Sequence, residues 1–577
     1  MDPGYRPDGW RVHLFLGMTT PVGRTRSVPV DAVLRAALCI PTPLLVGRLT
    51  GEPIAGVIIA MGALWAIAQD VGQSHWIRVR RISTGGVTSA VGLAVGQVAV
   101  RTGHASVVAV CLVLVAALAG AVSYSGTYGS IGGVQALLGV VVGSGFALPG
   151  PFWLPPVQLF LGTLLVLGCL LLSWVYQRHT AEMLAAARLF DAAHSVVASA
   201  GTVDADTAQR SLVTAANEAH RILSRYRRGT GARTRTTAAN DVLRAYDISY
   251  ELGAIATALA SEGARVSPVL VNDCKKLRGQ LNLPTTSQTR DGAAEVAGSA
   301  PPGGTPAVHA LRSLVSDVHV GTPATFPGGR AVKAGVGWQI RAWSAGVLAT
   351  CIFAAVMAAG WMHGSRAYWL PLAVAFIYKP ELAPIPGRAL HRCIGTILGA
   401  VLAITVASTG FSTYPSVFLV ALCGVLLAVG HEIHYVVSTL ALTTIAFVLV
   451  DFLGDSRNLL WDRILDTCIA AAIVFAAYVL VPPISWAHRA RRAVTQAEAA
   501  CARYVEESPF ADDERQTLLR RDADSLTADA RLAVGHAQKE WGRKGDWASA
   551  LKLIESAERR NAATTARIVA SQHSASL

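Results

Sequence analysis

Apolar stretches of helical length dominate this chain, and they fall into two blocks of six that a long polar region separates. A straight helix needs about 20 mostly apolar residues to cross a bilayer. Only 15% of the residues are charged and 52% are hydrophobic, whereas a soluble domain carries about 25% charged residues. The chain is therefore predicted to be an all-α integral membrane protein.

The alternation of apolar and polar sequence divides the chain into six parts. These parts are a cytoplasmic N-terminal segment at 1–30, a first transmembrane block at 31–176, a cytoplasmic helical domain at 177–282, a disordered linker at 283–330, a second transmembrane block at 331–483 and a cytoplasmic C-terminal helical domain at 484–577. The linker prediction rests on the segment AGSAPPGGTPA, because chain rich in Pro, Gly and Ser seldom buries enough apolar surface to fold.

Twelve spans are predicted within the blocks. Those of the first block lie at about 31–48, 53–69, 84–100, 105–122, 128–148 and 155–176. Those of the second block lie at about 341–361, 366–379, 391–409, 414–430, 434–452 and 462–482. Span boundaries read from a single sequence are good to about 2–4 residues.

The charge of the connecting loops predicts how the blocks are oriented. In both blocks Lys and Arg gather before the first span, after the second span and after the sixth. Loops rich in Lys and Arg stay in the cytoplasm. The protein is therefore expected to be a multi-pass plasma (inner) membrane protein with both termini in the cytoplasm. The blocks then share one polarity, which predicts two parallel six-helix transmembrane bundles with cytoplasmic helical domains.

The third span of each block carries a pair of glycines four residues apart. These pairs are Gly92 with Gly96 and Gly395 with Gly399, and each follows a basic segment. Small residues at this spacing let helix backbones approach closely in lipid. Their recurrence at the same position in both blocks predicts helix-packing sites and supports an internal repeat.

Two spans are interrupted or short. Pro41 and Pro43 interrupt the first span, and the segment 366–379, which contains Pro371, is too short to cross a bilayer comfortably as a straight helix. Interrupted helices in transporters often mark the place where a solute is held. The alternative is that these prolines only kink packed helices.

Three arginines lie where a solute path would open. Arg35 and Arg341 stand just inside the first span of each block, and Arg392 opens the third span of the second block. A guanidinium at the edge of the hydrocarbon needs a partner, so such residues often line ion paths. They could attract a carboxylate, or they could reach lipid headgroups as anchors.

Aromatic and acidic residues complete the predicted path. Trp369 and Phe376 lie on the short span and could stack on an aromatic solute, although an interfacial aromatic belt is the alternative. Asp466 lies in the first turn of the last span and is a candidate carboxylate facing the bundle interior, with Arg463 as its partner. His434, in the segment GHEIHY, could respond to protons, although an ordinary polar turn is preferred.

Several other classes of function find no support in the sequence. Walker A sequence is absent, which leaves an ion gradient or passive flow as the source of energy. The nine cysteines lack metal-ligand spacing, and no nucleophile pairs with a base, so neither a metal, a cofactor nor catalysis is expected. The basic residues flank apolar spans, so the net charge of +13 does not indicate nucleic acid.

Residues 338–483 resemble the fusaric acid resistance (FUSC) and aromatic acid exporter family, which is distantly related to plant aluminium-activated malate transporters. The matching features are Arg341, the pair Tyr368–Trp369, and the segments GRALHRCIGTILGA and RILDTCIA. The first block matches this pattern only loosely. The resemblance implies an inner-membrane exporter of organic anions, typically aromatic carboxylates, with proton coupling as one source of energy.

The expected function is a secondary transporter that exports small organic anions, in particular aromatic carboxylic acids, across the plasma membrane. Arg35, Arg341 and Arg392 would supply positive potential, Trp369 and Phe376 an apolar face, and the solute would sit where the two blocks meet. An anion channel of the malate-channel type and a membrane-anchored scaffold for cytoplasmic partners are the alternatives. The expected partners are the lipid bilayer and the anion, and the sequence leaves open whether the chain forms homo-oligomers.

Overall fold

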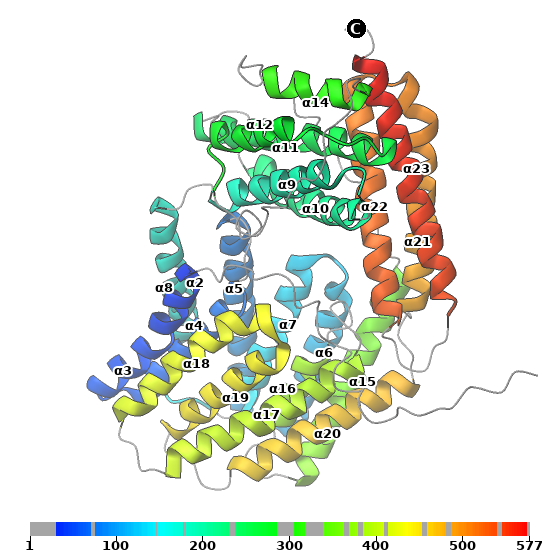
Figure 1. Ribbon diagram of the computed structural model, residues 1–577. Helices are drawn as coiled ribbons and strands as arrows, with labels where there is room; N and C mark the ends of the chain where they lie inside the picture. The colour runs from blue at the N-terminus through cyan, green and yellow to red at the C-terminus, as the bar shows by residue number, and fades with distance from the viewer. Residues whose placement is uncertain are drawn as a thin grey trace, which may run out of the picture.

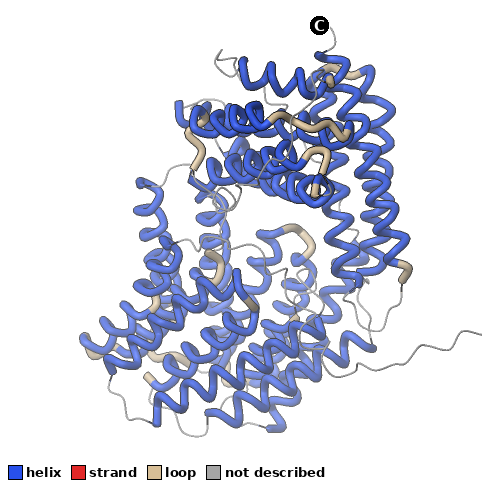
Figure 2. Tube along the Cα trace, viewed as in Figure 1, coloured by secondary structure: helices blue, strands red, loops and turns tan. Residues whose placement is uncertain are grey.

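The computed structural model describes residues 30–70, 75–145, 147–176, 180–202, 204–229, 237–284, 305–317, 338–362, 368–378, 385–408, 413–452, 459–480, 486–538 and 545–573. No strand occurs among these residues, and helices make up nearly all of them (Figure 2). The prediction of an all-α protein is confirmed. The predicted N-terminal segment 1–30 lies, except for Val30, outside the described residues.

Each predicted apolar span overlaps one helix, except the first, which overlaps two. The helices of the first block are α2 (Val30–Cys39), α3 (Pro41–Leu49), α4 (Pro53–Ile67), α5 (His75–Arg101), α6 (Ala105–Ser123), α7 (Thr127–Gly145) and α8 (Leu154–Tyr176). The first span is divided into α2 and α3 at Ile40, because Pro41 has no N–H to continue the hydrogen bonding of α2.

The second block contains one unusually short helix. Its helices are α15 (Trp338–Met362), α16 (Trp369–Ile377), α17 (Ile385–Ser408), α18 (Thr413–Ile433), α19 (Tyr435–Asp451) and α20 (Leu459–Leu480). Among the described residues of both blocks, eight helical stretches are long and apolar enough to cross a membrane. The helices α4, α18 and α19 carry shorter apolar stretches, and α16 has only nine residues.

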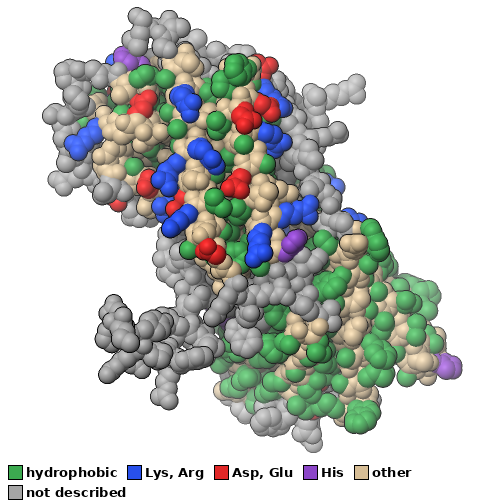
Figure 3. All heavy atoms as spheres, turned by 90° about the vertical axis from the view of Figure 1, so that its right-hand side faces the viewer, with side chains coloured by type: hydrophobic (Ala, Val, Ile, Leu, Met, Phe, Trp, Pro, Cys, Tyr) green, Lys and Arg blue, Asp and Glu red, His purple; other side chains and the backbone are tan. Residues whose placement is uncertain are grey.

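The remaining helices are polar and lie to one side of the apolar ones (Figure 1). They are α9 (Thr180–Ser199), α10 (Ala205–Gly229), α11 (Thr237–Glu262), α12 (Pro268–Gln280), α14 (Pro306–Asp317), α21 (Trp486–Glu507), the short 3₁₀ helix η1 (Ser508–Phe510), α22 (Asp513–Gln538) and α23 (Trp547–His573). In Figure 3 hydrophobic side chains cover the apolar part, whereas Lys, Arg, Asp and Glu gather on the polar part. This contrast is what a membrane region next to an aqueous region requires.

Part of the predicted linker is wrong, because residues 306–317 form the helix α14. Ala307, Ala310 and Leu311 are completely buried at the spacing of one helical face. The helix packs against α11 and α23. Burial of this apolar stripe orders a segment whose Pro- and Gly-rich surroundings suggested flexible chain.

The same contacts between helices recur in the two blocks. In the first block α5 packs on α7, α4 on α8, and α6 on α7; in the second block α17 packs on α19, α16 on α20, and α18 on α19. The recurrence extends across the blocks, since α2 packs on α18 and α15 packs on α6. The first helix of each block therefore contacts the fourth helix of the other.

The glycine pairs lie in these recurring contacts. A Cβ atom added at Gly92 would collide with the backbone oxygen of Ala136 on α7, and one at Gly96 would lie 2.5 Å from the oxygen of Val140. A Cβ atom added at Gly399 would lie 2.6 Å from the oxygen of Leu440 on α19. Both third helices can approach the fifth helices this closely only because they lack side chains at these positions.

Replacing Gly92 with Ala is expected to destabilise the protein. The added methyl group must push α5 away from α7, and overpacking of this kind costs about 1–3 kcal/mol. The matched control is Gly168→Ala on α8, where an added Cβ would meet no atom within 4 Å. Thermal unfolding in detergent should show a lower midpoint for Gly92→Ala and no decrease for Gly168→Ala, and equal midpoints would contradict the packing described here.

Candidate solute site around the short helix α16

The short helix α16 is surrounded by other helices. It packs against α7, α15, α17 and α20, and most of its side chains, including Trp369 and Leu370, are buried. Its nine residues extend over about 13 Å, which is less than half of the hydrocarbon thickness of about 30 Å. Pro371 lies in the first turn, where a missing backbone N–H breaks no helical hydrogen bond.

Two arginines from neighbouring helices lie over the aromatic rings of α16. The guanidinium carbon of Arg392, on α17, lies 4.5 Å from the centre of the Phe376 ring. The guanidinium carbon of Arg463, on α20, lies 4.8 Å from the centre of the Trp369 ring. Trp369 and Phe376 are seven residues apart, which separates the two arginine–aromatic pairs by about 10 Å along the helix axis.

Both arginines are buried and keep unused hydrogen-bond donors. Arg392 is 3% exposed and Arg463 is 5% exposed. In the part of the chain that the structure describes, Arg392 Nε and Arg463 Nη1 have no hydrogen-bond partner, and neither does the hydroxyl of Thr396, one turn after Arg392. An unmet buried donor costs about 1–3 kcal/mol, and more when it is charged. Such donors could bind a carboxylate.

Asp466 places one negative charge near this arrangement. It is 2% exposed, and it interacts electrostatically with Arg463, as does Arg392. Tyr368 contacts Trp369 edge to face, with 6.1 Å between the ring centres. The structure thus brings together four of the predicted path residues, namely Trp369, Phe376, Arg392 and Asp466.

Arg35 lies elsewhere, in a closed network of charges within the first block. Its guanidinium donates hydrogen bonds to Asp31 at 2.9 Å, to Asp70 at 2.9 and 3.0 Å, and to Ser173 at 3.0 Å. Arg78, on α5, donates to the same two carboxylates. Two arginines therefore face two aspartates, so the charge of Arg35 is already balanced.

Arg341 does not join either group of charges. It lies in the first turn of α15, where its side chain is exposed. An exposed guanidinium at the end of an apolar helix fits the alternative of a headgroup anchor.

Sequence reasoning named Arg463 only as a partner of Asp466. An arginine inside an apolar helix is itself a signal for a functional site, and that signal could have identified Arg463 as a path residue. The contacts of Arg35 with Asp70 and Ser173 bridge 35 and 138 residues, so no local pattern could have shown them.

Two histidines, His391 and His434, contact each other near the start of α19. The rings of His391, on α17, and His434 contact each other with 4.8 Å between their centres. His434 also caps α19, because its Nδ1 accepts a hydrogen bond from the N–H of Val436 at 3.3 Å. The searched, described residues contain no group of three His, Cys, Asp or Glu arranged to hold a metal.

Comparison with known proteins places this site in a recognised membrane domain. Residues 353–477 match the family model described as Fusaric acid resistance protein-like, and this range contains both arginine–aromatic pairs. The chain is also similar to the inner membrane protein YccS of Escherichia coli (strain K12), at 27% identity over 195 residues. That match covers 33% of this chain and 27% of YccS, so the chain spans about a quarter of its relative.

No solved structure matches the chain. The apolar helices and the family match together define a helical, multi-pass membrane protein. The match to the model described as Fusaric acid resistance protein-like lies in its second block.

The two kinds of arginine should respond oppositely to neutral replacement. Arg392→Met removes a buried charge whose burial costs on the order of 2–3 kcal/mol of stability. The same replacement loses the contact with the Phe376 ring, which stabilises the protein by about 0.5–2 kcal/mol. The unfolding midpoint in detergent should therefore rise slightly or stay unchanged. Arg35→Met, the matched control, leaves two carboxylates facing one arginine and should destabilise by about 3 kcal/mol. A large loss of stability in Arg392→Met would show that its charge is already satisfied.

Proposed function

We propose that this protein is a secondary transporter that exports small organic anions, in particular aromatic carboxylic acids, across the plasma (inner) membrane. The observation that supports this proposal most strongly is that two buried arginines lie over aromatic rings: Arg392 over Phe376, and Arg463 over Trp369. The family description, which names fusaric acid resistance, and the printed name of YccS, which names an inner membrane protein, support this proposal.

The chemistry of each pair fits an aromatic carboxylate. The unmet Arg392 Nε and Arg463 Nη1 donors would bind the carboxylate, since hydrogen bonds between charged groups are about twice as strong as neutral ones. The ring of the solute would pack edge-on or offset against Phe376 or Trp369. In each arginine–aromatic pair the arginine would therefore bind the carboxylate of the solute, and the aromatic side chain would contact its ring.

Two such pairs along one helix make a path. A solute held at one pair is about 10 Å from the next, and the charge of Asp466 beside Arg463 weakens the hold on an anion there. Movement requires sites that bind well enough to admit the anion and weakly enough to release it. In the proposed orientation Arg392 lies nearer the cytoplasm, so the anion passes from Arg392 to Arg463.

The proposed framework is two parallel six-helix bundles with both termini in the cytoplasm. The recurrence of helix contacts between the blocks supports this duplication. The two blocks differ in their buried charges. The first carries a balanced set of charges around Arg35, whereas the second carries arginine donors without a hydrogen-bond partner among the described residues. We therefore place the solute within the second block, and not where the two blocks meet.

A proton gradient is the proposed source of energy. The rings of His391 and His434 contact each other, His391 precedes Arg392 in the sequence, and imidazole exchanges protons near neutral pH. An anion channel is the second candidate, because two successive cationic sites also suit conduction. Currents that follow the Nernst potential of the anion in a planar bilayer would select the channel.

Loss of the charge at Arg392 should abolish most transport. Efflux of labelled benzoate from proteoliposomes is expected to fall at least about tenfold in Arg392→Gln, because one lost charged hydrogen bond is worth about 1.5–3 kcal/mol. Arg341→Gln removes the same charge at an exposed position and should keep most of the flux. Unchanged efflux in Arg392→Gln, or an equal loss in both variants, would reject the proposed path.

Phe376 should decide the preference for aromatic solutes. Its replacement by Leu keeps an apolar side chain but removes an aromatic contact worth about 0.5–1.5 kcal/mol. The ratio of benzoate flux to acetate flux should therefore fall about two- to twelvefold, while acetate flux alone changes little. A constant ratio would mean that the solute ring does not contact Phe376.

A further inference from the structure

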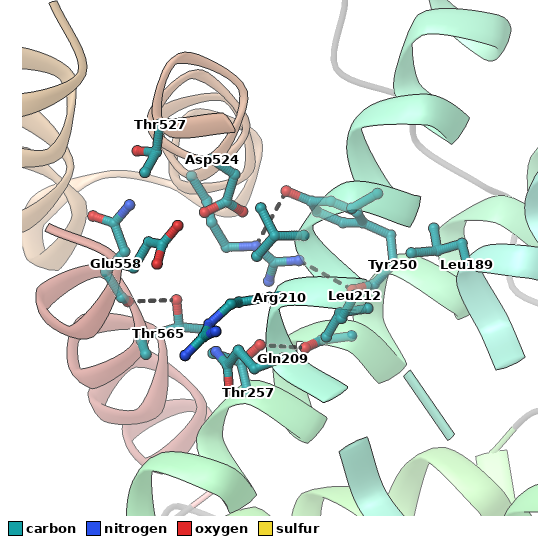
Figure 4. Close-up of a pocket in the computed structure, with 16 residues that line it drawn as sticks. Leu189, Gln209, Arg210, Leu212, Tyr250, Thr257, Asp524, Thr527, Glu558 and Thr565 are labelled. Atoms are coloured by element: carbon teal, nitrogen blue, oxygen red, sulfur yellow. Dashed lines mark hydrogen bonds between the residues drawn. The ribbon is translucent and has the colours of Figure 1, made fainter. Parts of the chain in front are cut away.

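A pocket lies where the polar helices of the two halves of the chain meet. It is lined by α9, α10 and α11 on one side and by α22 and α23 on the other (Figure 4). Its volume is about 60 Å³, which is enough for several water molecules or one small solute. The proposed transport path does not use this pocket.

One carboxylate in the pocket has no hydrogen-bond partner among the described residues. Asp524, on α22, lines the pocket and is half-buried, and its side chain accepts no hydrogen bond from a described residue. Burial raises the pKa of Asp524 to about 6, against the opposing effect of Arg520. The neighbouring carboxylate of Glu558 is already paired, because Arg531 donates to both of its oxygens at 2.8 and 3.2 Å.

Arginine donors are also available. Arg520 is fixed by Tyr250, since it donates to the phenol oxygen at 3.1 Å and to the backbone oxygen at 3.0 Å. Its guanidinium carbon lies 4.0 Å from the centre of the same ring, and its Nη1 makes no hydrogen bond to a described residue. Arg210, on α10, is exposed and lines the same pocket, as Figure 4 shows.

A buried amide completes the set. Asn561, on α23, lines the pocket and is 5% exposed. Its Oδ1 accepts no hydrogen bond within the described part of the chain. Buried amide oxygens are nearly always paired, so this atom indicates that something else donates to it.

We propose that this pocket binds a small zwitterion, an α-amino acid with a short side chain. Its ammonium group donates to the carboxylate of Asp524 and to Oδ1 of Asn561, which are the two unmet acceptors. Its carboxylate accepts from Nη1 of Arg520 and from Arg210, which are the available donors. An amine without a carboxylate would form no hydrogen bond with the two arginines. A carboxylate without an ammonium group would be repelled by the carboxylate of Asp524.

Binding would join the two polar regions. The lining helices α9–α11 follow the first apolar block, and α22 and α23 follow the second. An amino acid that contacts Asp524 on one side and Arg210 on the other therefore stabilises one relative placement of these helices. The site would regulate the membrane region through this placement, whatever solute that region moves.

Calorimetric titration of the full-length protein in detergent tests the site directly. The probes are glycine and alanine, with ethylamine and propionate as the two half-molecules. Glycine or alanine should bind at least about tenfold more tightly than either half-molecule. Lowering the pH from 7 to 5 should weaken this binding about tenfold, because Asp524 then becomes protonated.

Two matched variants separate binding from folding. Asp524→Asn should weaken binding of the amino acid at least about tenfold, whereas Asp522→Asn, on the exposed side of the same helix, should bind like the unaltered protein. Absence of heat with every probe, equal binding of the half-molecules, or full affinity in Asp524→Asn would overturn the proposal and leave a pocket that holds only water. None of these outcomes depends on whether the membrane region transports anions.

Discussion

A buried guanidinium in a membrane protein must find a compensating group, and this requirement divides the molecule into two kinds of site. In the first block Arg35 and Arg78 face Asp31 and Asp70, and the resulting network joins α2, α5 and the segment that follows α4. In the second block Arg392 and Arg463 face aromatic rings, which compensate a charge only in part. The first arrangement is balanced in itself, whereas the second sets the single carboxylate of Asp466 against two arginines.

The same framework carries both arrangements. The third helix of each block packs on the fifth through glycines, and the first helix of each block packs on the fourth helix of the other. Such interlocked contacts resist separation of the blocks. Within this frame the short helix α16 carries the two aromatic rings, Phe376 and Trp369, over which Arg392 and Arg463 lie.

Much of this fold could be predicted from the sequence, because helix positions depend on local apolar runs and on prolines. The break before Pro41, the short helix at 369–377 and the close approach at Gly92 all follow from residues within one segment. The distant pairings could not be predicted, since Arg463 reaches Trp369 across 94 residues of chain. The exposure of Arg341 and the burial of Ala307 on α14 depend on tertiary contacts that neighbouring sequence does not encode.

The most direct test is to locate a bound aromatic anion in the second block. Crystals of the protein with 4-iodobenzoate would give an anomalous signal from iodine, and the density would show where the carboxylate lies. The carboxylate is expected within about 3 Å of a guanidinium nitrogen of Arg392 or Arg463, with its ring against Phe376 or Trp369. A well-occupied anion between the two blocks, or beside Arg35, would contradict the account.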